Sequence, residues 1–188
     1  KNFSDEFLCG SYDDENKIKE SYDTFSEIVE KLENKGLSRL VEDLGEDLLM
    51  SPAHAQKDEY GCRPAGLIDF ALDIAQVMRK LNVVGAFEAD TKSIYTVALL
   101  RAIGEYGTSF AKMFEPHDSD WHVEKLGLLY KRNPTLNGTT WAQRCTELVC
   151  VYSVTLSSEE IMALTSQPGN PNNNSLAKLL DAATTIIL

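Results

Sequence analysis

Residues 94–106 read Ile-Tyr-Thr-Val-Ala-Leu-Leu-Arg-Ala-Ile-Gly-Glu-Tyr and form a very apolar segment of the 188-residue chain. The apolar residues in it recur at spacings of three and four, which is the pattern of a buried helix face. They are Ile94, Val97, Ala98, Leu100 and Ile103. We therefore expect a helix over 94–106 that lies at the centre of the core.

On either side of this segment, the same spacing predicts helices over 14–35, 37–48, 67–81, 139–152 and 175–187, with a loop at 51–64. Gly36 is typical of a helix stop, and Ser175 can cap the last helix. Ser157 and Glu160 form a capping box that begins a further short helix before Pro168.

The fold class predicted from these elements is all-α, with about six or seven helices in a single bundle. Residues 107–138 have no clear period, and a short β-hairpin or helical turn is expected near 121–131. Residues 1–11 suggest a loose arm. We expect the arm and first helix, residues 1–36, to pack on a helical domain at 37–188.

The composition and charge of the chain argue against nucleic-acid binding, membrane insertion and secretion. Lys and Arg number 18 against 29 Asp and Glu, so the net charge is −11, which disfavours a broad nucleic-acid footprint. No apolar run approaches the roughly 20 residues that span a bilayer, and the N-terminus lacks the pattern of a secretory signal. The four cysteines contain no C-x-x-C pair and suggest free thiols, so a cytoplasmic location without membrane partners is expected.

Five segments, in the same order along the chain, resemble the HD-domain metal-dependent phosphohydrolases, in particular small phage and bacterial members related to the HD exonucleases. The central segment ALLRAIGE, residues 98–105, resembles the family's ALLHDIGK. The remaining four are Ser51–Ala53, Pro64–Leu72, Val154–Leu164 and Leu180–Thr184. The resemblance covers roughly residues 37–188 and implies an HD-domain-like helical fold.

The family's metal ligands are almost entirely missing. The resemblance places the former metal-site positions at Tyr60, Asp69, Phe70, Arg101, Ala102, Thr139, Gln167 and Asp181, and of these only Asp181 matches an expected ligand. Hydrolysis in this family needs a divalent metal that activates water, and a fixed guanidinium at Arg101 would repel it. We therefore expect no catalytic residue, no bound metal and no cofactor.

These departures lead to a functional hypothesis. We expect a catalytically inactive HD-domain-like protein, phage-encoded, that acts as a protein-binding or structural module in the host cytoplasm or the virion. Its partner would be another protein, a second copy or a virion assembly. Two alternatives stay open: a phosphohydrolase with a rebuilt metal site, and a nucleotide or anion binder that uses Arg101 as a clamp.

The chain has only three histidines, and two of them lie in one loop. His117, Asp118, Asp120 and His122 could form a relocated metal site, but a spacing of five does not align two histidines on one helix face, which favours a solvated loop. His54 with Ser51 and Asp69 resembles a catalytic triad on paper. No Gly-x-Ser-x-Gly motif supports it, so an ordinary loop histidine is expected.

Overall fold

The structure, a computed structural model, describes residues 12–188, and the arm expected at 1–11 lies outside the described residues. Within that range the chain is 64% helical, which confirms the all-α fold class. The α-helices are α2 (Tyr12–Leu32), α3 (Lys35–Leu49), α4 (Gly66–Gly85), α5 (Thr91–Tyr106), α6 (Asp120–Leu126), α7 (Trp141–Tyr152), α8 (Ser158–Thr165) and α9 (Ser175–Ile187). A short 3-10 helix, η1, covers Pro134–Leu136.

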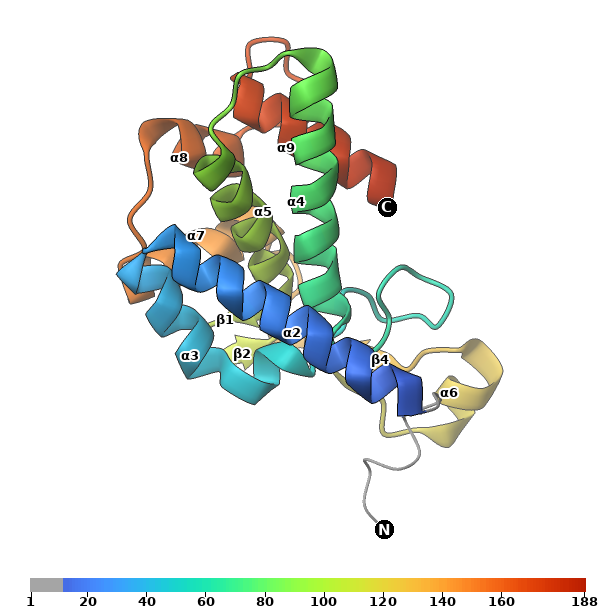
Figure 1. Cartoon of the computed structure of the whole chain (residues 1–188). Coiled ribbons are helices and arrows are strands. Elements are labelled where there is room, and N and C mark those ends of the chain that lie inside the picture. The colour runs from blue at the N-terminus through green and yellow to red at the C-terminus, as the bar shows by residue number, and fades with distance from the viewer. Residues whose placement is uncertain (1–11) are drawn as a thin grey trace.

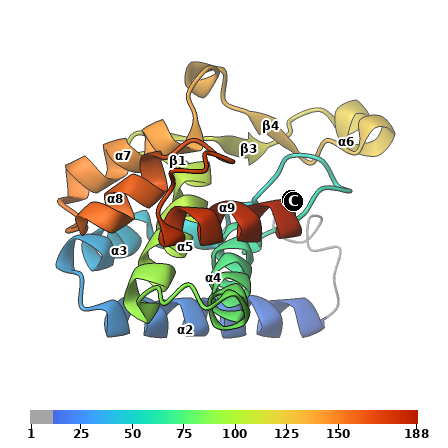
Figure 2. The same ribbon diagram turned by 90° about the horizontal axis from the view of Figure 1, so that it is seen from above.

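Helix α5 lies at the centre of the fold, as its sequence predicts. Ile94, Val97, Ala98 and Leu100 are fully buried, and Ile103 is 1% exposed. Helix α5 packs most extensively against α4 and α7. Figures 1 and 2 show α2 along one side of the α4–α5 pair and α7, α8 and α9 on the other. A single apolar core joins these layers, from Phe25 on α2 to Ala183 on α9.

The helix bounds differ from those expected by up to four residues, and at two of them the residue expected to mark the helix end has another role. Gly36 does not end a helix but lies in the first turn of α3, whose N-cap is Asn34. A Cβ at Gly36 would lie 2.5 Å from the carbonyl oxygen of Ser153, so a close approach of two segments requires glycine here. Ser175 is the first residue of α9 rather than its cap, because the side chain of Asn174 accepts the hydrogen bond from Ala177 N–H. The capping box of Ser157 and Glu160 is confirmed.

The region without period, 107–138, holds two small antiparallel sheets. Strand β1 (Gly107–Thr108) pairs with β2 (Ala111–Lys112), and β3 (Phe114–Pro116) pairs with β4 (Tyr130–Arg132). The antiparallel β3–β4 pair flanks residues 117–129, so it is wider than the short hairpin expected near 121–131. The helical turn that was the alternative there is present as α6. The β3–β4 pair shares a second small core with the 51–64 loop, made by Ala55, Cys62, Met113, Phe114, Tyr130 and Leu136.

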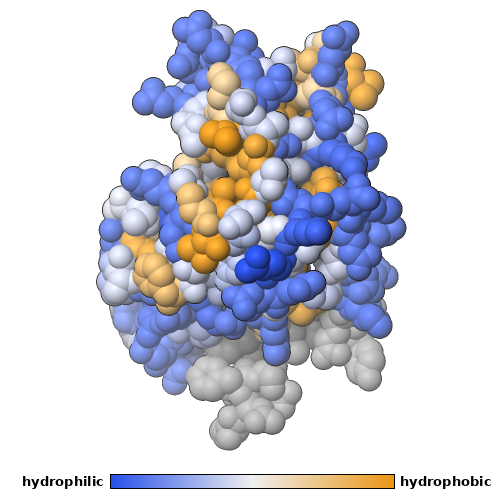
Figure 3. All heavy atoms as spheres, turned by 90° about the vertical axis from the view of Figure 1, so that its left-hand side faces the viewer, coloured by the Kyte–Doolittle hydropathy of each residue, from blue (hydrophilic) through white to orange (hydrophobic). Residues whose placement is uncertain are grey.

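Apolar side chains are also found on the surface of α7 and α8. Val151, Ile161 and Met162 are each about half exposed, and we call them the α7–α8 face. Figure 3 shows the side of the molecule that carries α3, α7 and α8, with apolar groups gathered near its middle. Of the described helices, none combines the length and the apolar character that crossing a membrane requires.

Candidate functional site

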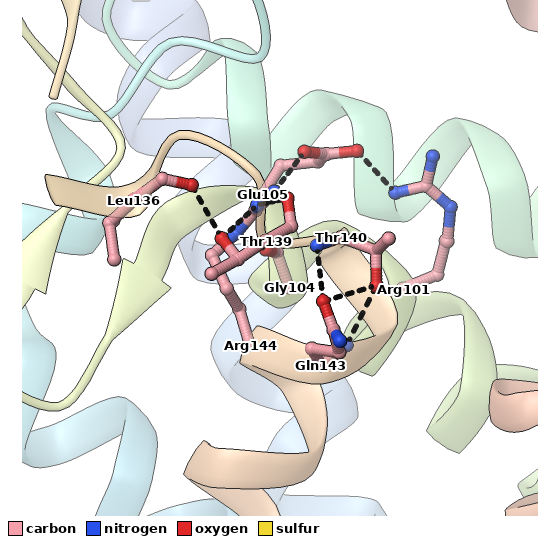
Figure 4. A network of polar contacts seen from close by, with 8 residues as sticks. All are labelled: Arg101, Gly104, Glu105, Leu136, Thr139, Thr140, Gln143 and Arg144. Atoms are coloured by element: carbon pink, nitrogen blue, oxygen red, sulfur yellow. Dashed lines mark hydrogen bonds and ion pairs between the residues drawn. The ribbon is translucent and has the colours of Figure 1, made fainter. Parts of the chain in front are cut away.

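A buried network of charges joins α5 to α7. Arg101 Nη1 donates to Glu105 Oε1 at 2.8 Å, one helical turn further along α5. The second oxygen of the same carboxylate, Oε2, accepts from Arg144 Nη2 at 2.8 Å. The two arginine side chains are only 7% and 4% exposed, and that of Glu105 is 22% exposed. The Glu105 carboxylate therefore balances part of the positive charge of both buried arginines (Figure 4).

Arg144 uses its remaining donors to hold the segment before α7. Its Nε donates to the carbonyl of Gly104 at 2.8 Å, and its Nη1 donates to the carbonyl and hydroxyl oxygens of Thr139 at 2.8 and 3.0 Å. Burial lowers the pKa of Arg144, and the Glu105 carboxylate opposes that change by favouring the charged form. The network thus fixes the start of α7 against the end of α5.

Arg101 is held differently, between two aromatic rings. Its guanidinium carbon lies 4.3 Å from the ring centre of Trp141 and 5.4 Å from that of Phe70. Aromatic faces attract cations, so this environment suits a buried guanidinium. Among the described residues, Arg101 Nε and Nη2 have no hydrogen-bond partner, yet neither is sealed from solvent. Two N–H groups of Arg101 are therefore available to a ligand.

A small pocket of about 150 Å³ lies beside Arg101, between α5, α7, α8 and α9. Trp141, Ala163, Pro168 and Leu180 give it largely apolar walls, and Asp181 also lines it. Asp181 Oδ2 accepts from the backbone N–H of Gly169 at 2.9 Å. Arg101 and Asp181 do not form an ion pair with each other, so opposite charges line the same pocket without direct contact.

The structure brings five of the former metal-site positions into one neighbourhood. The Tyr60 ring lies 5.7 Å from that of Phe70, Phe70 lies beside Arg101, and Arg101 shares its pocket with Asp181. Thr139 joins them through Arg144. The Tyr60 hydroxyl also donates to Asp73. Burial is the main cause that raises the pKa of Tyr60, and this hydrogen bond is the second. These side chains offer a metal one carboxylate beside a guanidinium and do not fit a divalent cation.

The other three predicted positions are next in the chain to residues of that neighbourhood or of the pocket, but their own contacts differ. Asp69 accepts from Ser21 Oγ at 2.6 Å and pairs with Arg63, and it lines a groove between α2 and α4. Ala102 is fully buried in the main core. Gln167 lies in the loop after α8, where its carbonyl accepts from Asn173 Nδ2 at 2.9 Å.

The histidines form no catalytic group with the partners considered above. His54 Nδ1 contacts the carbonyl of Tyr60 at 2.7 Å, whereas Ser51 donates to the carbonyl of Asp47, so the triad suggested by the sequence does not assemble. The rings of His117 and His122 stack at 4.4 Å, and both Nδ1 atoms contact Ser119. Across residues 12–188, no three His, Cys, Asp or Glu side chains lie close enough to hold a metal ion.

Sequence reasoning missed Glu105 and Arg144 as members of this site. Two signals point to them in retrospect. Glu105 follows Arg101 at the i,i+4 spacing of a helical ion pair. Arg144 precedes Leu148 by four positions, which puts a charged residue on the buried face of α7. A charge on an apolar face requires a buried partner, but the spacing alone does not show which helix supplies it.

The chain matches no protein-family model, no curated protein and no solved structure. The HD-domain resemblance therefore rests on the quoted sequence segments alone.

Proposed function

We propose that this chain is a catalytically inactive HD-domain-like protein that works as a binding or structural module for a protein partner. The observation that carries the proposal is the Arg101–Glu105–Arg144 network. By the HD-domain resemblance, Arg101 stands where the family has a metal-ligating histidine. The Arg101 guanidinium forms an ion pair with Glu105 and cation–π contacts with the rings of Trp141 and Phe70.

Electrostatics disfavours a metal at this position. A divalent cation beside Arg101 would face a fixed positive charge in a region of low dielectric, where repulsion is strong. Among the described residues, Asp181 is the one carboxylate that lines the pocket, and a single carboxylate rarely holds a divalent ion against a cation. The alternative of a rebuilt hydrolase site has no comparable support from Asp69, His54 or the His117–His122 loop, because each has other partners.

Metal binding tests this proposal directly. Equilibrium dialysis of the purified chain against Mn²⁺, Ni²⁺, Zn²⁺ or Fe²⁺, followed by elemental mass spectrometry, should give well under one ion per chain. Asp181→Ala should bind the same amount as the unaltered chain. One ion per chain that is lost in Asp181→Ala would refute the proposal.

The α7–α8 face supports the protein-binding part of the proposal. Contacts to a partner protein are made by apolar side chains that stay exposed in the free chain, and Val151, Ile161 and Met162 meet that requirement. Ile161→Asp should reduce the partner retained when tagged protein is purified from its native cells. Val84→Asp is the matched control, because Val84 is 86% exposed on α4. Equal loss with both variants would count against the α7–α8 face.

A second candidate function, an anion binder, is favoured by the two unpartnered donor nitrogens of Arg101. The pocket restricts this candidate. A cavity of about 150 Å³ holds a ligand of roughly benzene size, so a whole nucleotide exceeds the described pocket.

A further inference from the structure

We infer that the pocket beside Arg101 binds a small zwitterion, namely an α-amino acid with a short side chain. The inference goes beyond the proposed function, and it rests on that proposal's claim that the Arg101 site holds no catalytic metal. It starts from the two opposite charges, Arg101 and Asp181, that line one small cavity without touching each other.

On the cationic side of the pocket, Arg101 has hydrogen-bond donors without a partner among the described residues. The Arg101 side chain is 93% buried, since 7% of it is exposed, and only its Nη1 is hydrogen-bonded among the described residues. Nε and Nη2 present two N–H groups in the fork that matches a carboxylate. Phe70 and Trp141 lie against the guanidinium group and Glu105 accepts from it, so the side chain is already ordered and loses little freedom when a ligand binds.

The anionic side has a spare acceptor. Asp181 Oδ2 accepts from Gly169 N–H, which fixes the carboxylate, and Oδ1 has no partner among residues 12–188. An ammonium group can donate to that oxygen.

The combination of charges selects the ligand class. A simple anion would be attracted by Arg101 but repelled by Asp181, and a simple cation would meet the reverse. A molecule with a carboxylate and an ammonium satisfies both sides at once. The volume of about 150 Å³ sets the size at roughly six heavy atoms, and the apolar walls of Ala163, Pro168 and Leu180 suit a short aliphatic side chain. L-Alanine meets these requirements and is the probe of choice.

The two tryptophans provide a built-in readout. Trp141 lines the pocket, whereas Trp121 lies on α6 and does not. In ¹H–¹⁵N spectra, L-alanine should shift the indole N–H signal of Trp141 in a saturable way and leave that of Trp121 in place. Acetate should bind at least about tenfold more weakly, and methylammonium should not shift either signal.

Asp181→Asn tests the role of the second charge, because the amide oxygen can still accept from Gly169 and keep the loop in place. L-Alanine should lose about tenfold in affinity and come close to acetate. Glu159→Gln, an exposed change of the same charge on α8, should leave both affinities unchanged.

Three results would overturn the inference: no shift of Trp141 with L-alanine, equal affinity for acetate and L-alanine in the unaltered chain, or no effect of Asp181→Asn. Metal binding separates this inference from the proposed function. L-Alanine binding in a chain that also holds one metal ion would reject only the proposed function, whereas absence of both would reject only the zwitterion site.

Discussion

Arg101 combines a full positive charge with a position near the centre of an apolar fold. An uncompensated buried charge is very costly, and here Glu105 and two aromatic rings compensate it. Glu105 also serves Arg144, so one carboxylate supports two cations. At the residue scale, stability around the site therefore depends on Glu105 more than on either arginine alone.

Glu105→Gln should lower the free energy of unfolding by about 3 kcal/mol, because it leaves two buried guanidinium groups facing each other without their shared carboxylate. Urea unfolding followed by circular dichroism measures the change. Glu27→Gln is the matched control: it removes the carboxylate of another i,i+4 pair, that with Lys31, whose side chains are 63% and 71% exposed. Glu27→Gln should leave the free energy of unfolding unchanged. If Glu27→Gln and Glu105→Gln lowered it equally, Glu105 would be no more important to stability than a carboxylate in an exposed ion pair.

The thiols of the chain should differ in reactivity. Burial raises the pKa of Cys145 to about 12 and that of Cys62 to about 11, whereas Cys150 is exposed. Because the thiolate is the nucleophile, iodoacetamide at about pH 8 should modify Cys150 and spare Cys145 and Cys62 in the native chain. Peptide mass spectrometry measures this. Alkylation of Cys145 as fast as Cys150 would show that α7 does not bury it.

At the scale of elements, the crossing of α5 and α7 positions the site. Arg144 can reach the Gly104 carbonyl because Gly104 has no side chain to separate the helices. A Cβ there would lie 2.5 Å from the carbonyl oxygen of Trp141 and 3.2 Å from the Cβ of Cys145.

Gly104→Ala tests how closely α5 and α7 cross, because a close crossing and helix propensity would change the free energy of unfolding in opposite directions. Helix propensity alone would stabilise the chain by about 1 kcal/mol. Because the added methyl meets backbone that cannot move freely, we expect instead a loss of about 1–3 kcal/mol in the free energy of unfolding. A thermal melt measures the direction, and a rise in melting temperature would contradict the close crossing.

Elements with long apolar periods could be predicted, and those fixed by distant contacts could not. Helix α5 was expected because five of its apolar residues repeat at helical spacing, and the structure buries all five. Gly36 was misplaced because its role depends on Ser153, far along the chain. Strands β3 and β4 span only Phe114–Pro116 and Tyr130–Arg132, too short for a period of two to be visible.

The candidate site likewise has one residue that the sequence indicated and others that only the contacts between helices reveal. The sequence indicated Arg101 as the unusual residue, because the HD-domain resemblance places it where that family has a metal-ligating histidine. It did not show that Arg144 would meet Glu105 across two helices, since that contact depends on how α5 and α7 cross. Nor did it show that Asp69 would turn toward Ser21 and Arg63 while Asp181 lines the pocket of Arg101.

At the scale of the whole molecule, buried tyrosines link stability to pH. The pKa of Tyr130 and Tyr106 is raised from 10.0 to about 12, mainly by burial, and that of Tyr152 to about 12, mainly by its hydrogen bond to Asp43. The folded chain thus holds these protons more tightly than the unfolded chain. Their stabilising effect is complete below about pH 10 and is lost as the pH rises toward about 12.

The urea midpoint should therefore fall steeply between about pH 10 and 12, and the fall should be less steep in a Tyr130→Phe variant, which lacks one of these three phenols. An equally steep fall in Tyr130→Phe would show that the folded chain does not hold the Tyr130 proton more tightly than the unfolded chain does.

A turnover assay shows whether the Arg101 site has any catalytic activity. Release of phosphate or nucleoside from a panel of nucleotides and phosphodiesters is measured with the purified chain in the presence of Mn²⁺, Mg²⁺, Ni²⁺ or Fe²⁺, beside Asp181→Ala prepared in the same way. The charge network at Arg101 predicts that both proteins give the rate of buffer alone. A metal-dependent rate in the unaltered chain that Asp181→Ala abolishes would contradict the claim that this site binds without catalysing.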